Sequence, residues 1–308
     1  MLRWITGTLG VLLLALAAGC GGSDDHPGNI VEVAQSDTRF SILVEAVQAA
    51  ELTTALSDQG TLTVFAPTND AFAALLAELG VTKDQLLANK PLLTAVLKYH
   101  VLGSVVRSGD VPVGKAITSI GGGVFKIDKV GADLVINDGR NRKSKIIQAN
   151  VEASNGVIHA IDKVILPADK TVVETAIATP DFSILVEAVV AAGLADTLSG
   201  PGPFTVFAPT NEAFASLLAE LGVTKAQLLA DTALLTKVLT YHVVPGMVLK
   251  AGVPINAPIT TVEGGTFTVS PTLVITDQRG RQSSIVAADV LASNGVIHVI
   301  DKVILPAP

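Results

Sequence analysis

Apolar positions in the first third of the chain recur with the period of an α-helix. Phe40, Leu43, Val44 and Val47 fall at i, i+3, i+4 and i+7, which predicts an amphipathic helix. Two further helices are predicted by apolar stripes combined with end signals. The stripes and signals are Phe72, Leu75, Leu76 and Leu79 between Thr68-Asn69 and Gly80, and Leu93, Val96 and Leu97 after Pro91. Thr82 and Gln85 have the spacing of a capping box.

The pattern then changes to that of β-strands. A short strand at 62–66 is predicted to end at Pro67, and further strands follow the glycines at 121–123. These strands are expected at 124–127, 134–137, 145–151 and 157–166, the last ending at Pro167. Asn155-Gly156 predicts a tight hairpin turn with positive φ before the last strand. Helices followed by strands predict an α+β domain.

The whole pattern occurs twice. Residues 153–168 and 292–307 differ only at Ala160 against Val299. Other segments also return in order: FSILVEAV at Phe40 and Phe182, TVFAPTN at Thr63 and Thr205, and Tyr-His-Val at Tyr99 and Tyr241. Such a long period indicates two copies of a whole domain. We assign domain 1 to residues 29–168 and domain 2 to residues 171–306, and expect a semi-rigid rod with a modest interface.

The N-terminal residues have the pattern of an export signal. Arg3, an apolar run at 5–18 and the small residues before Cys20 predict a signal peptide at 1–19. This segment resembles the lipobox of bacterial lipoproteins, which implies that Cys20 is acylated and that the protein is lipid-anchored in the cell envelope, at an outer membrane or the cell surface. A plain secretory peptide with an incidental cysteine is the alternative. Residues 20–28, rich in Gly, Ser and Asp, are expected to form a flexible tether.

Composition limits the classes of protein. Hydrophobic residues make up 49% and charged residues 16%, which predicts folded domains with filled cores. The net charge of −7 argues against nucleic acid as a partner, because non-specific binding to nucleic acid needs a basic surface. With a single cysteine the chain forms no internal disulfide, so the domains must be held by packing alone.

Four histidines are the first candidates for chemistry. His100 and His242 fall on apolar helical faces, whereas His159 and His298 lie in predicted strands. A metal or catalytic site built from His100 and His159 is one interpretation. The other is a set of core histidines bonded to the backbone, which is favoured because no carboxylate or cysteine stands at a ligand spacing. We expect no metal and no cofactor.

A basic cluster and the missing enzyme motifs complete the candidates. Arg140, Arg142, Lys143 and Lys145 predict either a patch for an acidic glycan or phosphate, or a solvated hairpin tip. The segment GDVPVGKA resembles a phosphate loop, but Ala116 replaces the metal-binding hydroxyl. The sequence has no G-x-S-x-G, H-E-x-x-H or C-x-x-C motif, so we expect no enzymatic activity.

Three repeated segments resemble the signature segments of the fasciclin (FAS1) domain family. They are TVFAPTNDAFAAL, the Tyr-His pair, and ASNGVIHAIDKVILP, and each has its counterpart in the second copy. Their motif residues are Tyr99, His100, Asn155 and His159 in the first copy, and Tyr241, His242, Asn294 and His298 in the second. The resemblance covers about residues 29–306 and implies two tandem β-wedge domains decorated with helices.

The resemblance also implies a function. Members of this family are mostly secreted or surface-anchored modules linked to adhesion and matrix binding. In some, an Asp-Ile motif before the last segment is tied to receptor binding; Asp289-Val290 matches it, whereas Asn150-Val151 lacks the carboxylate. We therefore expect a non-enzymatic adhesion module whose partner is a matrix or cell-surface protein or glycan. A carrier of an apolar small molecule and an unrecognised hydrolase are the alternatives.

Overall fold

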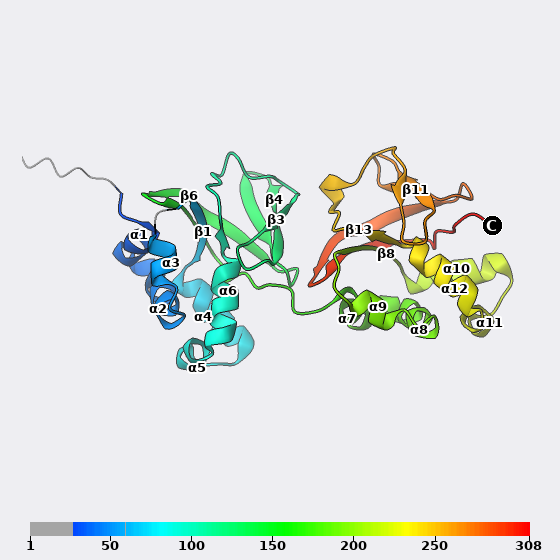
Figure 1. The fold of residues 1–308 in the computed structure, drawn as a ribbon, viewed down its shortest axis with the longest axis horizontal. Coiled ribbons are helices and arrows are strands. Elements are labelled where there is room, and N and C mark those ends of the chain that lie inside the picture. The colour runs from blue at the N-terminus through cyan, green and yellow to red at the C-terminus, as the bar shows by residue number, and fades with distance from the viewer. Residues whose placement is uncertain (1–26, 59) are drawn as a thin grey trace, which may run out of the picture.

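The computed structural model describes residues 27–58 and 60–308, which form two α+β domains lying end to end (Figure 1). The expected signal peptide, Cys20 and most of the expected tether lie outside the described residues. Within the described part, no helix combines the length and the apolar character that crossing a membrane requires.

The helices of domain 1 form one layer against its sheet. They are α1 (Ile30–Ser36), α2 (Ser41–Ala49), α3 (Thr53–Ser57), α4 (Asn69–Leu79), α5 (Lys83–Ala88) and α6 (Lys90–Tyr99), with a 3₁₀ turn at Thr38–Phe40. The three helices predicted from apolar stripes are confirmed as α2, α4 and α6. The Thr82 and Gln85 capping box starts α5, and Gly80 ends α4 in the left-handed conformation.

Two short helices were not predicted. α1 and α3 have 7 and 5 residues, too few to show a helical period in the sequence. For α1 a signal does exist, because Asn29 and Glu32 form a capping box at its start.

The sheet of domain 1 has seven strands in the order β2-β1-β7-β6-β5-β4-β3. The strands are β1 (Leu62–Pro67), β2 (Val101–Leu102), β3 (Ala116–Thr118), β4 (Val124–Val130), β5 (Asp133–Asn137), β6 (Lys143–Ala153) and β7 (Gly156–Ile161). Only β1 and β7 run parallel; the other neighbours are antiparallel. The amide of Ile120, just beyond β3, donates to the carbonyl of Val101 in β2 at 2.9 Å. The two ends of the sheet therefore meet, which gives the barrel-like wedge.

Strand β1 separates two apolar cores. Val64 and Ala66 face the helices and pack in a cluster with Phe72 and Leu93. Phe65 faces the other way, into the interior of the curved sheet with Tyr99 and Phe125. The rings of Phe65 and Phe125 meet edge to face with their centroids 5.4 Å apart. Alternation along one buried strand thus supplies both faces of the domain with core residues.

The closing strand is shorter than predicted. The expected strand at 157–166 ends at Ile161, and the buried residues 164–166 continue without strand pairing. The reason is that side chains bind their backbone: the amide of Ile165 donates to Nε2 of His100, and the amide of Leu166 donates to Oδ2 of Asp138. Pro167 therefore follows a side-chain-bound segment and does not end the strand.

The hairpin before β7 also differs from its prediction. The two turn residues are Ser154 and Asn155, and Gly156 is already the first residue of β7. A Cβ atom at Gly156 would lie 2.1 Å from the carbonyl oxygen of Leu62, and one at Gly295 would lie 2.3 Å from that of Phe204. The close approach of a parallel neighbour therefore requires the glycine in both domains, and Gly156 also has the predicted positive φ, of 156°.

Domain 2 repeats this architecture, with its strands in the order β10-β11-β12-β13-β14-β8-β9. Its helices are α7 (Val172–Ile177), α8 (Ser183–Ala191), α9 (Ala195–Ser199), α10 (Asn211–Leu221), α11 (Lys225–Ala230) and α12 (Thr232–Tyr241), with 3₁₀ turns at Pro180–Phe182 and Lys250–Gly252. Its strands are β8 (Phe204–Pro209), β9 (Val243–Pro245), β10 (Ile259–Thr260), β11 (Thr266–Val269), β12 (Val274–Thr276), β13 (Gln282–Ala292) and β14 (Gly295–Ile300). The predicted fold class, two tandem α+β wedges, is confirmed.

Candidate functional site

The paired tyrosines connect the last helix of each domain to its sheet. Tyr99, at the end of α6, donates its hydroxyl to the carbonyl of Val124 and accepts from the amide of Gly139, both at 2.8 Å. Tyr241 repeats the first bond with Thr266 at 2.7 Å, but the amide of Gln278 approaches only to 3.3 Å. Burial raises the pKa of Tyr99 far above its usual value and that of Tyr241 to about 12. Both hydroxyls are therefore neutral structural groups.

His100 and His242 hold the segment after the closing strand against the last helix. In His100, Nδ1 lies 2.7 Å from the carbonyl of Val96, and Nε2 accepts from the amide of Ile165 at 3.1 Å. His242 repeats both bonds with Val238 and Ile304. Burial lowers the pKa of each ring to about 4, so both are neutral at neutral pH. Because both nitrogens are used, neither ring has an atom free for a ligand.

The second histidine pair lies away from the first. Nε2 of His159 is 2.8 Å from the carbonyl of Val106, and Nδ1 accepts from the amide of Asn150 at 3.2 Å. His298 makes the same contacts with Val248 and Asp289. Burial lowers the pKa of both rings. The structure does not bring His100 and His159 together on a shared partner, and residues 27–58 and 60–308 contain no group of three His, Cys, Asp or Glu side chains placed to hold a metal ion.

The turn asparagines fasten the first and third helices of each domain. Oδ1 of Asn155 accepts from the amide of Ile30 at the start of α1, and Nδ2 donates to the carbonyls of Leu56 and Asp58 after α3. Asn294 makes the matching bonds to Val172, Leu198 and Gly200. Each asparagine side chain therefore holds the start of the first helix and the end of the third helix against the turn before the closing strand.

The basic turn is largely neutralised by its neighbours. Arg142 pairs with Asp138 at 2.8 Å and with Glu78 at 2.9 Å. Arg140 pairs with Asp169, Lys145 pairs with Asp133, and Lys143 is exposed. The four cations thus do not form a continuous positive patch.

Asp138 organises this turn, and sequence reasoning missed it. Its side chain is 2% exposed and accepts from the backbone amides of Arg140, Arg142 and Leu166 as well as from the Arg142 guanidinium. Asp277 accepts the matching amides in domain 2. The sequence signal for it is an Asp followed by a turn and a basic residue in both copies.

Asp289 and Val290 do not protrude from the surface. Asp289 lies at an irregularity in β13 with φ of 64°, and only 7% of the residue is exposed. Its Oδ1 accepts from the amide of Lys250 at 2.7 Å, and its Oδ2 lies 2.8 Å from Nζ of Lys126 in domain 1. Val290 packs partly buried against the helix-side core of domain 2. The expected exposed contact is therefore an interdomain contact in this structure.

Asp289 is one part of a seam between the domains. Asn141 in domain 1 and Leu291 in domain 2 exchange two hydrogen bonds, at 2.7 and 3.1 Å. Beside these contacts lies a cleft of about 860 Å³, with Gly121–Gly123 on one wall and Pro201–Pro203 and Ala292–Asn294 on the other. None of the side chains that line the cleft is charged.

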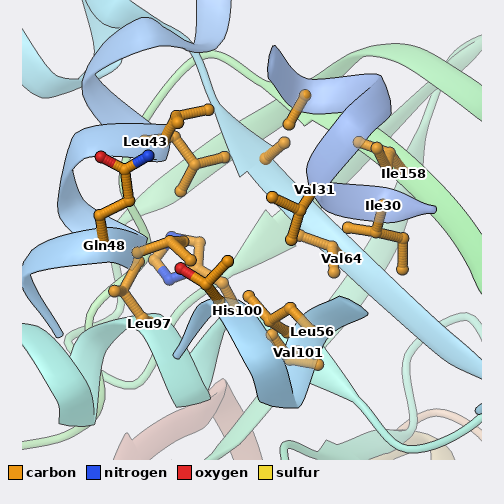
Figure 2. Close-up of a pocket in the computed structure, with 15 residues that line it drawn as sticks. Ile30, Val31, Leu43, Gln48, Leu56, Val64, Leu97, His100, Val101 and Ile158 are labelled. Carbon is orange, nitrogen blue, oxygen red and sulfur yellow. The ribbon is translucent and has the colours of Figure 1, made fainter. Parts of the chain in front are cut away.

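Each domain also has a small apolar pocket under its first helices. In domain 1 the pocket holds about 30 Å³ and is lined by apolar side chains such as Ile30, Leu43 and Val64, with Gln48 and His100 as polar neighbours (Figure 2). The domain 2 pocket holds about 90 Å³, and Val190 takes the place of Gln48. Cavities that bind a benzene-sized ligand are larger, about 150 Å³.

Comparison with known proteins identifies the domains. The family model described as "Fasciclin domain" matches residues 38–167 and 180–306. The chain is 48% identical over 144 residues to Protein sll1483 of Synechocystis sp., which covers 46% of this chain and 76% of that protein. It is 28% identical over 289 residues to periostin of Homo sapiens, with 92% of this chain and 32% of periostin covered. This chain therefore spans about a third of the length of periostin.

One solved structure is also similar to this chain. The FAS1 domain pair from the insect cell adhesion molecule fasciclin I is 18% identical, with a TM-score of 0.43, and the match covers 89% of this chain and 95% of that one. The two separate matches to the family model include most of the described residues. The chain belongs to the fasciclin domain family.

Proposed function

We propose that this protein is a non-enzymatic adhesion module that binds a matrix or cell-surface protein or glycan. Fasciclin domains are linked to adhesion and matrix binding, and this chain has two of them. The observation that carries the proposal is the use of the candidate reactive groups: both tyrosines and the four histidines of the two domains are buried and bonded to backbone. A partner would therefore contact other residues, which lie at the surface of the domains.

Two surfaces are candidates for the contact. The basic turn offers Lys143 directly, with Arg140, Arg142 and Lys145 engaged in ion pairs around it. Asp289 and Val290 form the second candidate, but their use in a contact requires that the seam between the domains opens. The uncharged cleft of about 860 Å³ lies beside this seam.

The proposal includes a lipid anchor at Cys20. Acylation there would tie the two domains to the cell envelope through residues 20–28, at an outer membrane or the cell surface. Metabolic labelling with an alkynyl fatty acid tests this directly. We expect label in the wild-type chain and none in Cys20→Ser; label retained in the variant would refute the anchor.

Attachment of cells tests the adhesive function. A non-adherent bacterial host that displays the full-length chain should attach to matrix-coated surfaces more strongly than the same host without the protein. Cys20→Ser, which lacks the proposed anchor, should be released from the cells and give no such gain. Lys143→Gln is the matched variant for the basic turn, because Gln282 stands at this place in domain 2. Attachment that is equal with and without the displayed protein contradicts the proposal.

Carriage of an apolar small molecule is the second candidate, and one observation favours it. The mouth of the domain 2 pocket is bordered by Ile177 and Val190, which are 62% and 64% exposed. At about 90 Å³ the pocket must widen to hold more than a few carbon atoms. Lipid or pigment that co-purifies with the protein, found by mass spectrometry of an organic extract, would support this function over adhesion.

A further inference from the structure

Asp289 and Asn150 occupy the same place in the two domains and make the same local bonds. Oδ1 of Asn150 accepts from the amide of Ser108 at 2.9 Å, as Oδ1 of Asp289 accepts from Lys250 at 2.7 Å. Both residues have positive φ, 58° and 64°, and both amides donate to a histidine Nδ1. An asparagine therefore accepts the same backbone bond and adopts the same conformation at this position, so these local bonds do not require the negative charge of Asp289.

The second oxygen of Asp289 is directed at the other domain. It lies 2.8 Å from Nζ of Lys126, which also pairs with Asp128 at 3.0 Å. The side chains of Lys126 and Asp289 are 13% and 4% exposed. Burial alone would lower the pKa of Lys126, but the hydrogen bonds to Asp289 and Asp128 raise it above its usual value. The pair is thus a buried, charged contact between the domains.

The two charges of this pair are not repeated at the matching positions of the two domains. Lys126 lies on β4, and the matching residue on β11 of domain 2 is Thr268. Asp289 lies on β13, and its match on β6 is Asn150. Each domain therefore carries only the charge that faces its neighbour, which is a form of specificity that charge pairs are suited to provide.

We propose that Lys126 and Asp289, supported by the two hydrogen bonds between Asn141 and Leu291, form an interdomain clamp. The clamp holds the two domains in one relative orientation and buries the Asp289 carboxylate beneath Lys126. Replacing one residue of the pair leaves the charge of the other unpaired and buried at the seam. This favours opening of the seam, because the remaining charge is then exposed to water. The inference does not depend on the proposed adhesive function.

Carboxyl footprinting of the full chain tests the burial. Carbodiimide with glycine ethyl ester labels accessible carboxylates, and mass spectrometry locates the label. We expect Asp289 to be protected in the wild type and labelled several-fold more in Lys126→Thr, which copies Thr268. Lys129→Thr, an exposed position on the same strand, is the control and should leave Asp289 protected. Equal labelling of Asp289 in the wild type and Lys126→Thr overturns the clamp.

Amide exchange of Leu291 provides a second readout. Its amide donates to Asn141 across the seam, and Glu152 is the matching amide in domain 1. In Asp289→Asn, which keeps the local bonds seen at Asn150, exchange of the Leu291 amide should accelerate by about tenfold or more while that of Glu152 is unchanged. An unchanged Leu291 rate in this variant, with its unfolding midpoint preserved, contradicts the clamp even if Lys126→Thr fails to fold.

Discussion

In both domains a tyrosine, two histidines and an asparagine join helices to sheet through matching backbone partners, whereas the residues at the seam and at the pocket mouths differ between the domains. Tyr99 and Tyr241 donate to equivalent strand carbonyls in their own domains. In contrast, Lys126 is replaced by Thr268 in domain 2, and Gln48 is replaced by Val190. These shared residues hold the fold, whereas the divergent residues at the seam and at the pocket mouths face a neighbour or solvent. The comparison therefore separates the residues that make the wedge from those that give each wedge its own contacts.

The largest expected effect comes from the glycine that opens the closing strand. Gly156→Ala places a Cβ atom 2.1 Å from the carbonyl oxygen of Leu62 and should destabilise domain 1 by about 3 kcal/mol or more. Gly295→Ala should do the same to domain 2. Urea unfolding with a domain-specific probe measures both, and Gly109→Ala, which has open space around it, is the control. If either variant matches the control, the parallel neighbour, β1 in domain 1 or β8 in domain 2, does not constrain that glycine as the structure indicates.

The core histidines predict a loss of stability in acid that is equal in the two domains. Folded His100 and His242 have pKa values of about 4, whereas the unfolded ring has its usual value of 6.5. The contribution of each neutral histidine to the free energy of unfolding is fully present above pH 6.5. It falls as the pH drops towards 4, because the unfolded chain then binds protons that the folded chain excludes. Each domain should lose about 3 kcal/mol across this window.

A variant shows whether the histidine causes this pH dependence. In His242→Gln, urea midpoints measured at several pH values should have a shallower slope for domain 2 only, whatever the absolute stability of the variant. His100 remains in domain 1 as the internal reference. An unchanged slope in domain 2 would assign the acid sensitivity to other groups.

The fold was largely predictable because its signals are local. Apolar stripes and the cap at Thr68 identified the longer helices, the capping box at Thr82 marked the start of the short α5, and β-branched runs identified most strands. The end of β7 was mispredicted because a continuous apolar run, 157–166, does not reveal where strand pairing stops. Beyond the strand, His100 and Asp138 accept the amides of Ile165 and Leu166, and these two side chains are distant in sequence.

The site was less predictable, for a related reason. Asp289 was selected for its position in a motif, and nothing in a single sequence shows that Lys126 of the other domain reaches it. Likewise, the cations of the basic turn looked free because their partners, Glu78 and Asp169, lie in other elements. Exposure and ion pairing depend on the tertiary arrangement, so sequence patterns identify candidate residues without showing which ones are accessible.

The tyrosines should differ in a smaller and more informative way. Tyr99→Phe removes two hydrogen bonds of 2.8 Å, which should cost about 1 to 2 kcal/mol, and leaves the amide of Gly139 with its 3.0 Å bond to the carbonyl of Leu166. Tyr241→Phe should cost less, because its bond from Gln278 is long at 3.3 Å. Calorimetry of both variants gives the difference. Equal losses would show that the bond to the strand carbonyl supplies nearly all the stabilisation.

The smallest effect on stability is expected at the mouths of the apolar pockets. Ile177 and Val190 in domain 2 stand where domain 1 has Gln35 and Gln48, and all four residues are exposed. Replacing both apolar residues with glutamine should change stability by less than about 0.5 kcal/mol, because exposed side chains bury little area on folding. Fluorescence of a hydrophobic dye should nevertheless fall, since the rim loses its apolar surface. The reverse exchange, Gln35→Ile with Gln48→Val, should raise dye binding to domain 1. If dye binding does not rise, the rim residues do not distinguish the two pockets, and the larger volume of the domain 2 pocket accounts for the difference in dye binding.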